Sequence, residues 1–151
     1  MSKPSLDTKT IFSSLPTALL VLTPDLTIVA ATDYYYELTF SEPSDLVGRN
    51  IAEVFPENPV TAKAKGINNM RESFDYVLRH GASHTIPVQR YDIKLPPNHK
   101  GKYMERWWRI TNSPVFNAKG ELLYVVHATE DVSQIVDTLI EAQNIIAKKR
   151  S

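Results

Sequence analysis

Few residues of this sequence have the types or the spacing that chemistry at a site requires. The chain contains four histidines and no cysteine. Without cysteine, disulfides, thiolate catalysis and zinc sites built on thiolates are excluded, as is any flavin or other chromophore attached through sulfur. Catalytic or metal chemistry would therefore have to come from the histidines and the carboxylates.

The histidines form no evident catalytic or metal site. His80 and His84 are four residues apart, but Gly81 between them is expected to end a helix, so the two rings would not share a helical face. His127 could act as a base only if an acid such as Asp92 reached it in a pocket, and nothing in the spacing requires that. We predict that the chain is not an enzyme, with a small enzyme built on this pair as an alternative.

The most informative pattern is the segment 124–133, in which an apolar run passes through Glu130 and Asp131 into a helical pattern without a loop. Adjacent carboxylates on a strand point apart, and Asp131 is expected to cap the helix that follows. The helix has apolar residues spaced by three and four, at Val132, Ile135, Leu139, Ala142 and Ile146. This coiled-coil seam predicts pairing with a second copy, because one such helix is marginal alone in water.

The elements that would position these residues follow in a clear order. Two β-rich runs, 17–23 and 26–32, are separated by the turn signal Pro24-Asp25 and predict a hairpin. Short helical patterns follow as far as Phe55, and a longer helix is predicted from Gly66 to Gly81. Three further strands are predicted at 86–94, 103–115 and 121–129. The order predicts an α+β fold, with a five-stranded antiparallel sheet and helices on one face.

Composition limits the partners. The 151 residues fit one domain with a terminal extension, and the 17 basic and 17 acidic residues cancel. A neutral chain lacks the positive field that attracts nucleic acid, so no nucleic-acid partner is predicted. No apolar run approaches the roughly 20 residues of a membrane span, and the N-terminus has no apolar signal core. We therefore predict no membrane span in this chain and a cytoplasmic location.

The order of elements and several short motifs together resemble the PAS domain. The resemblance covers roughly Ile11 to Val136, and this region is similar to PAS modules found ahead of bacterial histidine kinases. It is carried by Ile11-Phe12-Ser13-Ser14-Leu15-Pro16, Leu22-Thr23-Pro24-Asp25-Leu26-Thr27-Ile28-Val29, Leu46-Val47-Gly48-Arg49, Glu53-Val54-Phe55-Pro56, Arg90-Tyr91-Asp92-Ile93, Asn112-Ser113-Pro114-Val115 and Glu130-Asp131-Val132-Ser133. It implies an N-terminal helical cap over 1–15, a PAS domain over 16–131 and a C-terminal signalling helix over 132–151.

The resemblance also implies a ligand pocket between the longer helix and the sheet. Its expected wall residues are Phe55, Met70, Phe74, Val77, Tyr91, Trp108, Asn112 and Val126. Trp108 and Asn112 share one face of their strand, but the sequence leaves open which face points inward. The alternative is that these side chains fill a core without a ligand. The cofactor is left unknown, and haem is not expected, because its one candidate ligand, His80, suits the exposed end of a helix.

The resulting hypothesis is a sensory and dimerisation module of a bacterial signal-transduction protein. A small ligand or a partner would be sensed, and Glu130, Asp131 and Ser133 would relay the signal to the C-terminal helix. The expected partners are a second copy, through the N- and C-terminal helices, and a kinase or other output domain. The main alternative is a ligand-free protein–protein interaction module.

Overall fold

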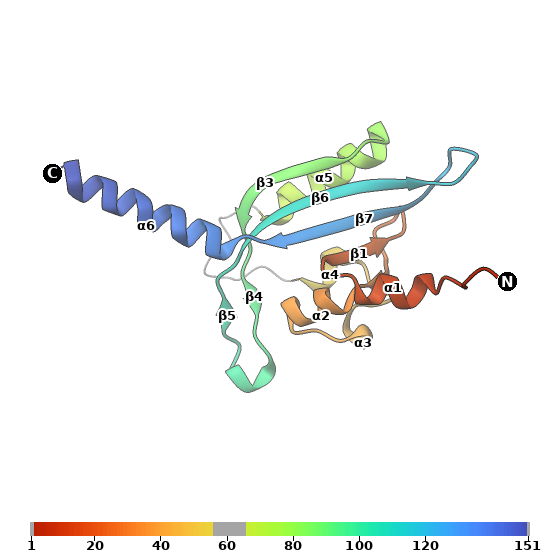
Figure 1. Ribbon diagram of the computed structural model, residues 1–151, viewed down its shortest axis with the longest axis horizontal. Coiled ribbons are helices and arrows are strands. Elements are labelled where there is room, and N and C mark those ends of the chain that lie inside the picture. Colours follow the sequence, from red (N-terminus) through yellow and green to blue (C-terminus); the bar gives the residue numbers. More distant parts are fainter. Residues whose placement is uncertain (1, 56–65, 151) are drawn as a thin grey trace.

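The computed structural model of the protein describes residues 2–55 and 66–150. Met1, residues 56–65 and Ser151 lie outside the described residues, as do Pro56 of the crossover motif and the outermost residues of the two predicted terminal segments. The core is a five-stranded antiparallel sheet in the order β2-β1-β7-β6-β3 (Figure 1). The predicted α+β fold is confirmed. The strands are β1 (Ala18–Leu22), β2 (Ile28–Ala31), β3 (His84–Arg90), β6 (Trp107–Phe116) and β7 (Leu122–Asp131).

Thr32 fixes the start of the fold. Its buried hydroxyl donates to the carbonyl of Thr17 at 2.6 Å and accepts from the backbone N–H of Leu19 at 3.0 Å. The same oxygen caps α2 (Asp33–Thr39) by accepting from the N–H of Tyr35. One side chain therefore joins the hairpin to the first helix behind it, and it fixes the position of Tyr35.

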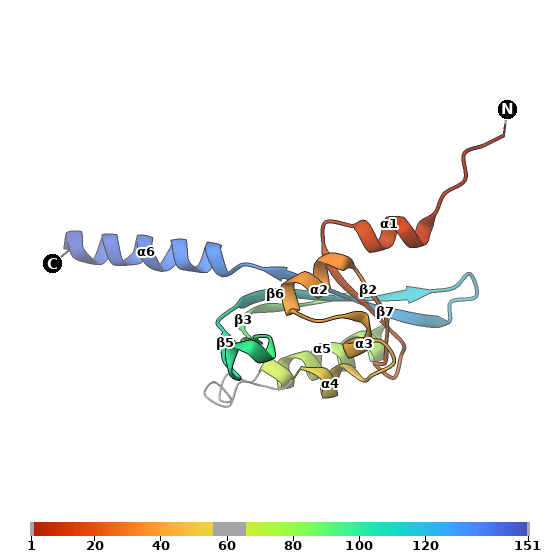
Figure 2. The same ribbon diagram turned by 90° about the horizontal axis from the view of Figure 1, so that it is seen from below.

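The helices of the domain lie on one face of the sheet, as predicted, and the N-terminal helix α1 lies on the other. In Figure 2, the helices α3, α4 and α5 lie below the sheet, whereas α1 lies above it. Phe74 and Val77 of α5 are buried against the strands, and Gly81, at a φ of +59°, ends this helix as predicted. The bounds are α1 (Thr8–Ser14), α3 (Pro43–Leu46), α4 (Ile51–Val54) and α5 (Gly66–His80).

Two predicted strands are divided in the structure. The run 86–94 ends in the main sheet at Arg90, and its continuation β4 (Ile93–Lys94) pairs only with β5 (Tyr103–Met104) in a separate hairpin. This hairpin, which includes the short helix η2 (Pro97–His99), extends away from the sheet (Figure 1). Pro87, which has no N–H to donate, falls where the register between β3 and β6 shifts, so the edge strand is irregular before it leaves the sheet.

The sheet has one buried face. Trp108, Ile110 and Asn112 of β6 are buried on it. The face of this strand that carries Trp108 and Asn112 therefore points inward, which the sequence had left open. Cross-strand pairing places Asn112 opposite His127 and Ile110 opposite Thr129. A row of polar groups therefore crosses an otherwise apolar interior.

The C-terminal helix α6 (Ser133–Arg150) projects away from the domain as a direct continuation of β7 (Figures 1 and 2). A single residue, Val132, separates the strand from the helix. Within the described part of the chain, no helix is long and apolar enough to cross a membrane.

Candidate functional site

The buried face of the sheet, together with α2, α4 and α5, borders an interior cavity of about 40 Å³. Of the predicted wall residues, four line it: Phe55, Met70, Tyr91 and Trp108. The cavity is also lined by Tyr35, Thr39, Ile51, Gln89, Ile93, Ile110, His127 and Thr129. The space admits about one to three water molecules, whereas pockets for drug-sized ligands have roughly 300–1,000 Å³.

The other predicted wall residues lie elsewhere. Phe74, Val77 and Asn112 are buried in the core but do not line the cavity. The placement of Val126 on the wall is wrong, because it belongs to the opposite face of β7 from the buried Val125 and His127. Val125, Val126 and His127 follow one another in a mainly apolar segment without alternation of polar and apolar residues. The sequence therefore did not show which face of β7 is buried.

A chain of hydrogen-bonded side chains, which we call the polar chain, runs from the cavity towards the surface. His127 Nδ1 lies 2.7 Å from Asn112 Oδ1, and Asn112 Nδ2 donates to Ser73 Oγ at 2.8 Å. Ser73 Oγ lies 2.8 Å from Nδ1 of the partly exposed His84. The three inner members are at most 2% exposed. Burial lowers the pKa of His127 to about 4, so its ring is neutral near pH 7.

The acid–base pair considered from the sequence does not form. Asp92 is bound by the guanidinium of Arg90 at 2.9 Å, while His127 is bound to Asn112. Three residues of this site were not predicted from the sequence: Ser73 of α5, Gln89 of β3 and Tyr35 of α2. None of them belongs to a recognisable motif. Pairing between strands and helices that are distant in the sequence brings them to this site.

A larger open groove of about 530 Å³ lies outside the cavity, between the segment α2–α4 and the hairpin of β4 and β5. Thr39, Phe55, Tyr91 and Ile93 line both spaces and so form the wall between them. The hydroxyl of Tyr91 donates to the carbonyl of Phe55 across this wall. Access to the cavity from this side therefore requires these residues to separate.

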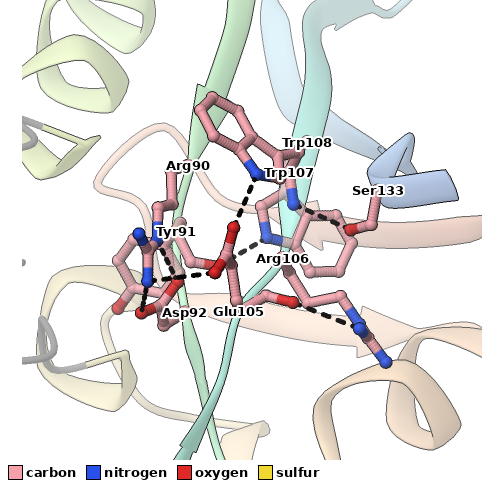
Figure 3. A network of polar contacts seen from close by, with 8 residues as sticks. All are labelled: Arg90, Tyr91, Asp92, Glu105, Arg106, Trp107, Trp108 and Ser133. Atoms are coloured by element: carbon pink, nitrogen blue, oxygen red, sulfur yellow. Dashed lines mark hydrogen bonds and ion pairs between the residues drawn. The ribbon is translucent and has the colours of Figure 1, made fainter. Parts of the chain in front are cut away.

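The junction of β7 and α6 is held by several polar contacts, part of which Figure 3 shows. Asp131 Oδ1 accepts from the N–H of Ser133 at 3.0 Å and from its hydroxyl at 2.6 Å, as expected for a residue that caps the helix. Ser133 Oγ in turn accepts from the N–H of Trp107 at 2.9 Å, and Val132 N donates to the carbonyl of Trp107 at 2.8 Å. The first turn of α6 is thereby fixed to β6 as well as to β7.

The two carboxylates before the helix point apart, as the alternation of a strand predicts. Asp131 pairs with Arg106 at 3.2 Å, and Glu130 pairs with Arg109, where both side chains are more than half exposed. The exposed pair is expected to contribute little to stability, because solvent screens it. The junction therefore depends on Asp131 and Ser133 more than on Glu130.

A profile that describes the PAS fold matches residues 12–137. The chain belongs to the PAS-fold family. PAS domains are generally sensory and interaction modules rather than catalysts. Comparison with curated protein sequences gives no match.

Solved structures share the PAS fold at low sequence identity. An RNA-binding light-oxygen-voltage receptor has a TM-score of 0.66 and 16% identity, over 97% of this chain and 41% of that one. A PAS domain from Colwellia psychrerythraea has a TM-score of 0.62 and 12% identity, over 83% of this chain and 94% of that one. A sensory box sensor histidine kinase from Vibrio cholerae has a TM-score of 0.54 and 18% identity, over 83% of this chain and 88% of that one. At these identities the similarity shows the fold alone.

The composition and the geometry limit the cofactors of this PAS domain. Because the chain has no cysteine, a cysteine-linked flavin is excluded despite the similarity to a light-oxygen-voltage receptor. Within residues 2–55 and 66–150, no three histidines and carboxylates are grouped in a way that could hold a metal ion. His80 and His84 both lie against the ring of Tyr76, with centroids 4.5 and 5.0 Å from it.

Proposed function

We propose that this PAS domain is a sensory and dimerisation module of a bacterial signal-transduction protein, in which a signal received at the interior cavity reaches α6 through β7. The observation that carries the proposal is the junction at Asp131 and Ser133, which joins a strand of the cavity wall to the helix without a loop. His127 and Thr129 line the cavity on the strand that ends at this junction. A shift of that strand would therefore move the first turn of α6.

The partner of α6 is a second copy of the chain. None of the side chains of α6 is buried, and Ile135, Leu139 and Ile146 of its seam are 58%, 59% and 51% exposed. Hydrophobic residues repeated at this spacing are typical of a two-stranded coiled coil. We call these three residues the α6 stripe. Ile11 of α1 is also 48% exposed, which supports a part for the N-terminal helix in the same dimer.

The output that follows α6 is proposed to be a histidine kinase or another signalling domain in the cytoplasm. The solved sensor histidine kinase from Vibrio cholerae, of which the similar region covers 88%, supports this type of output. The division into a helical cap over 1–15, a PAS domain over 16–131 and a signalling helix over 132–151 is part of this proposal.

Sedimentation equilibrium tests the dimer. We expect the wild-type chain to sediment as a dimer and Leu139→Lys to sediment as a monomer, because a lysine replaces the centre of the α6 stripe. Asn144→Lys adds the same charge away from the seam and should leave the dimer unchanged. A monomeric wild type, or a dimer that survives Leu139→Lys, would contradict the proposed partner of α6.

A second candidate is a ligand-free interaction module, which the small volume of the cavity favours. Native mass spectrometry combined with hydrogen exchange separates the two functions. A sensory module is expected to retain or take up a small molecule and to change its exchange between Glu130 and Ile146. An interaction module would take up none, and its exchange in that segment would respond only to a protein partner.

A further inference from the structure

The interior cavity contains polar atoms that have no partner among the described residues. Tyr35 and His127 are 4% and 2% exposed, and the hydroxyl of Tyr35 and Nε2 of His127 bond to no residue that the structure describes. Gln89, 8% exposed, accepts from Asn69 at 2.9 Å through Oε1, and its Nε2 likewise has no partner among the described residues. All three residues line the cavity.

These atoms are not sealed inside the protein. Among the described residues, every side-chain nitrogen or oxygen without accessible surface has a hydrogen-bond partner. The unpartnered atoms of Tyr35, Gln89 and His127 therefore have accessible surface, and the cavity is the space that all three of these buried residues line. Polar atoms in such a space are satisfied by what occupies it, because an unmet hydrogen bond in the interior is costly.

The polar chain decides what His127 offers to the cavity. Asn112 donates to Ser73 through Nδ2, so its Oδ1 faces His127, and a carbonyl oxygen can only accept. Nδ1 of His127 must therefore carry the proton. In the neutral ring this leaves Nε2 as a bare acceptor towards the cavity.

Tyr35 complements that acceptor. Burial raises the pKa of the Tyr35 hydroxyl far above its usual range, so the group stays protonated and can donate. The cavity thus presents an acceptor at His127 and donors at Tyr35 and Gln89. Among the described residues, no arginine or lysine lines it, and their one buried carboxylate, Asp92, lies in the outer groove and is paired with Arg90.

We propose that Tyr35 and His127 determine ligand specificity by selecting a small uncharged molecule that donates a hydrogen bond to Nε2 of His127 and accepts one from the hydroxyl of Tyr35. A short alcohol, diol or primary amide has this chemistry. The cavity volume limits such a ligand to a few non-hydrogen atoms. A carboxylate is rejected, because it would meet the lone pair of His127, and none of the described residues that line the cavity is a cation. The inference rests on the proposed sensory function, for which it names the class of ligand.

Nuclear magnetic resonance titration of the purified protein tests this selection. 1,2-Ethanediol is added to the isotope-labelled protein, and acetate, which has the same number of non-hydrogen atoms, is the matched probe. We expect saturable shifts for the diol at the ring of His127 and at Thr129, and no saturable shift there for acetate. A long-range spectrum of the His127 ring should show a protonated Nδ1 and a bare Nε2.

Tyr35→Phe is the decisive variant, because it removes a hydroxyl that has no described protein partner and so should not unfold the domain. Affinity for the diol should fall about five- to tenfold, as expected for one lost hydrogen bond. Tyr34→Phe removes a hydroxyl from the exposed side of the same helix and should leave the affinity unchanged.

Three results would overturn the proposal: no saturable binding of the diol, equal binding of acetate, or equal affinity in Tyr35→Phe and Tyr34→Phe. A proton on Nε2 of His127 near pH 7 would also overturn it. These measurements concern the cavity and do not depend on α6. A failed dimer test with a working cavity, or the converse, therefore shows which proposal is wrong.

Discussion

The interior of the domain and its C-terminal helix differ in which kinds of side chain they bury and which they expose. The three inner members of the polar chain, Ser73, Asn112 and His127, are buried, and each is bonded to the next. The α6 stripe is apolar and more than half exposed, and nothing in the described chain covers it. One region places polar groups where water is excluded, and the other places apolar groups where water is present.

Both arrangements cost free energy unless something compensates, and the difference lies in what compensates. The polar chain is compensated within the protein, up to the edge of the cavity where a ligand would continue it. The α6 stripe can be compensated only from outside, by a partner helix. β7 joins the two regions, so a change in the first can alter how the second is presented. This coupling requires that the ligand or partner bind the two arrangements with different affinity.

Asn112→Leu interrupts the polar chain in the interior and should have the largest effect on stability. Leucine has a similar size but leaves Nδ1 of His127 without its partner in the interior, and it leaves Oγ of Ser73 with its contact to His84 alone. We expect the free energy of unfolding to fall by about 2 to 4 kcal/mol. Urea denaturation measures it. Ser113→Ala, on the opposite face of the same strand, should change it by less than about 1 kcal/mol. Equal losses in the two variants would mean that the polar chain is not the stabilising feature.

Stability should also fall in mild acid because of His127. Its folded pKa, about 4, lies below the unfolded value of 6.5, so the unfolded chain binds more protons between these values. The contribution is fully present above pH 6.5 and is progressively lost as the pH falls towards 4. We expect a loss of about 2 kcal/mol between pH 7 and pH 5, measured by urea denaturation.

The matched variants isolate the source of this pH dependence. His127→Gln keeps an N–H that can bond to Asn112 but cannot titrate, so most of the loss between pH 7 and pH 5 should disappear. His99→Gln, in the exposed hairpin, should retain it. A wild-type stability that is flat over this range would show that the ring of His127 reaches water more freely than its burial indicates.

The fold could be predicted because its signals are local. Gly81 ends α5, the spacing of apolar residues predicts α6, and the turn at Pro24-Asp25 separates β1 from β2. The division of the later strands could not be predicted in the same way. The chain leaves the sheet after Arg90, where Nε1 of Trp108 binds the carbonyl of Tyr91 at 2.8 Å, and this contact joins residues distant in the sequence.

The cavity was only partly predictable for a related reason. Phe55, Met70, Tyr91 and Trp108 were expected on its wall from their apolar character. Tyr35 was missed, because an aromatic residue in a short helix gives no signal until the capping hydroxyl of Thr32 sets its direction. Val126 was misplaced because a continuous apolar strand does not show which side is buried.

The smallest predicted effect is at the junction, where Ser133→Ala separates the two regions without disturbing either. The alanine keeps the helix but removes the oxygen that accepts from the N–H of Trp107 and donates to Asp131. We expect the free energy of unfolding to fall by about 1 kcal/mol, and the amide of Trp107 to exchange its hydrogen about fivefold faster. The control is Thr138→Ala, because the exposed hydroxyl of Thr138 bonds only within α6. This variant should leave the hydrogen exchange of the Trp107 amide unchanged.

Ser133→Ala also tests whether the junction couples the cavity to α6. If the junction is the link, Ser133→Ala should keep the dimer of α6 and the binding of the diol, while the change in α6 exchange caused by the diol is reduced. If that change persists in full, the two regions communicate by another route, and the outer groove with its shared wall at Tyr91 and Phe55 becomes the next place to test. Exchange at Trp107 reports whether the contact was lost, so a negative result cannot be attributed to a junction that stayed intact.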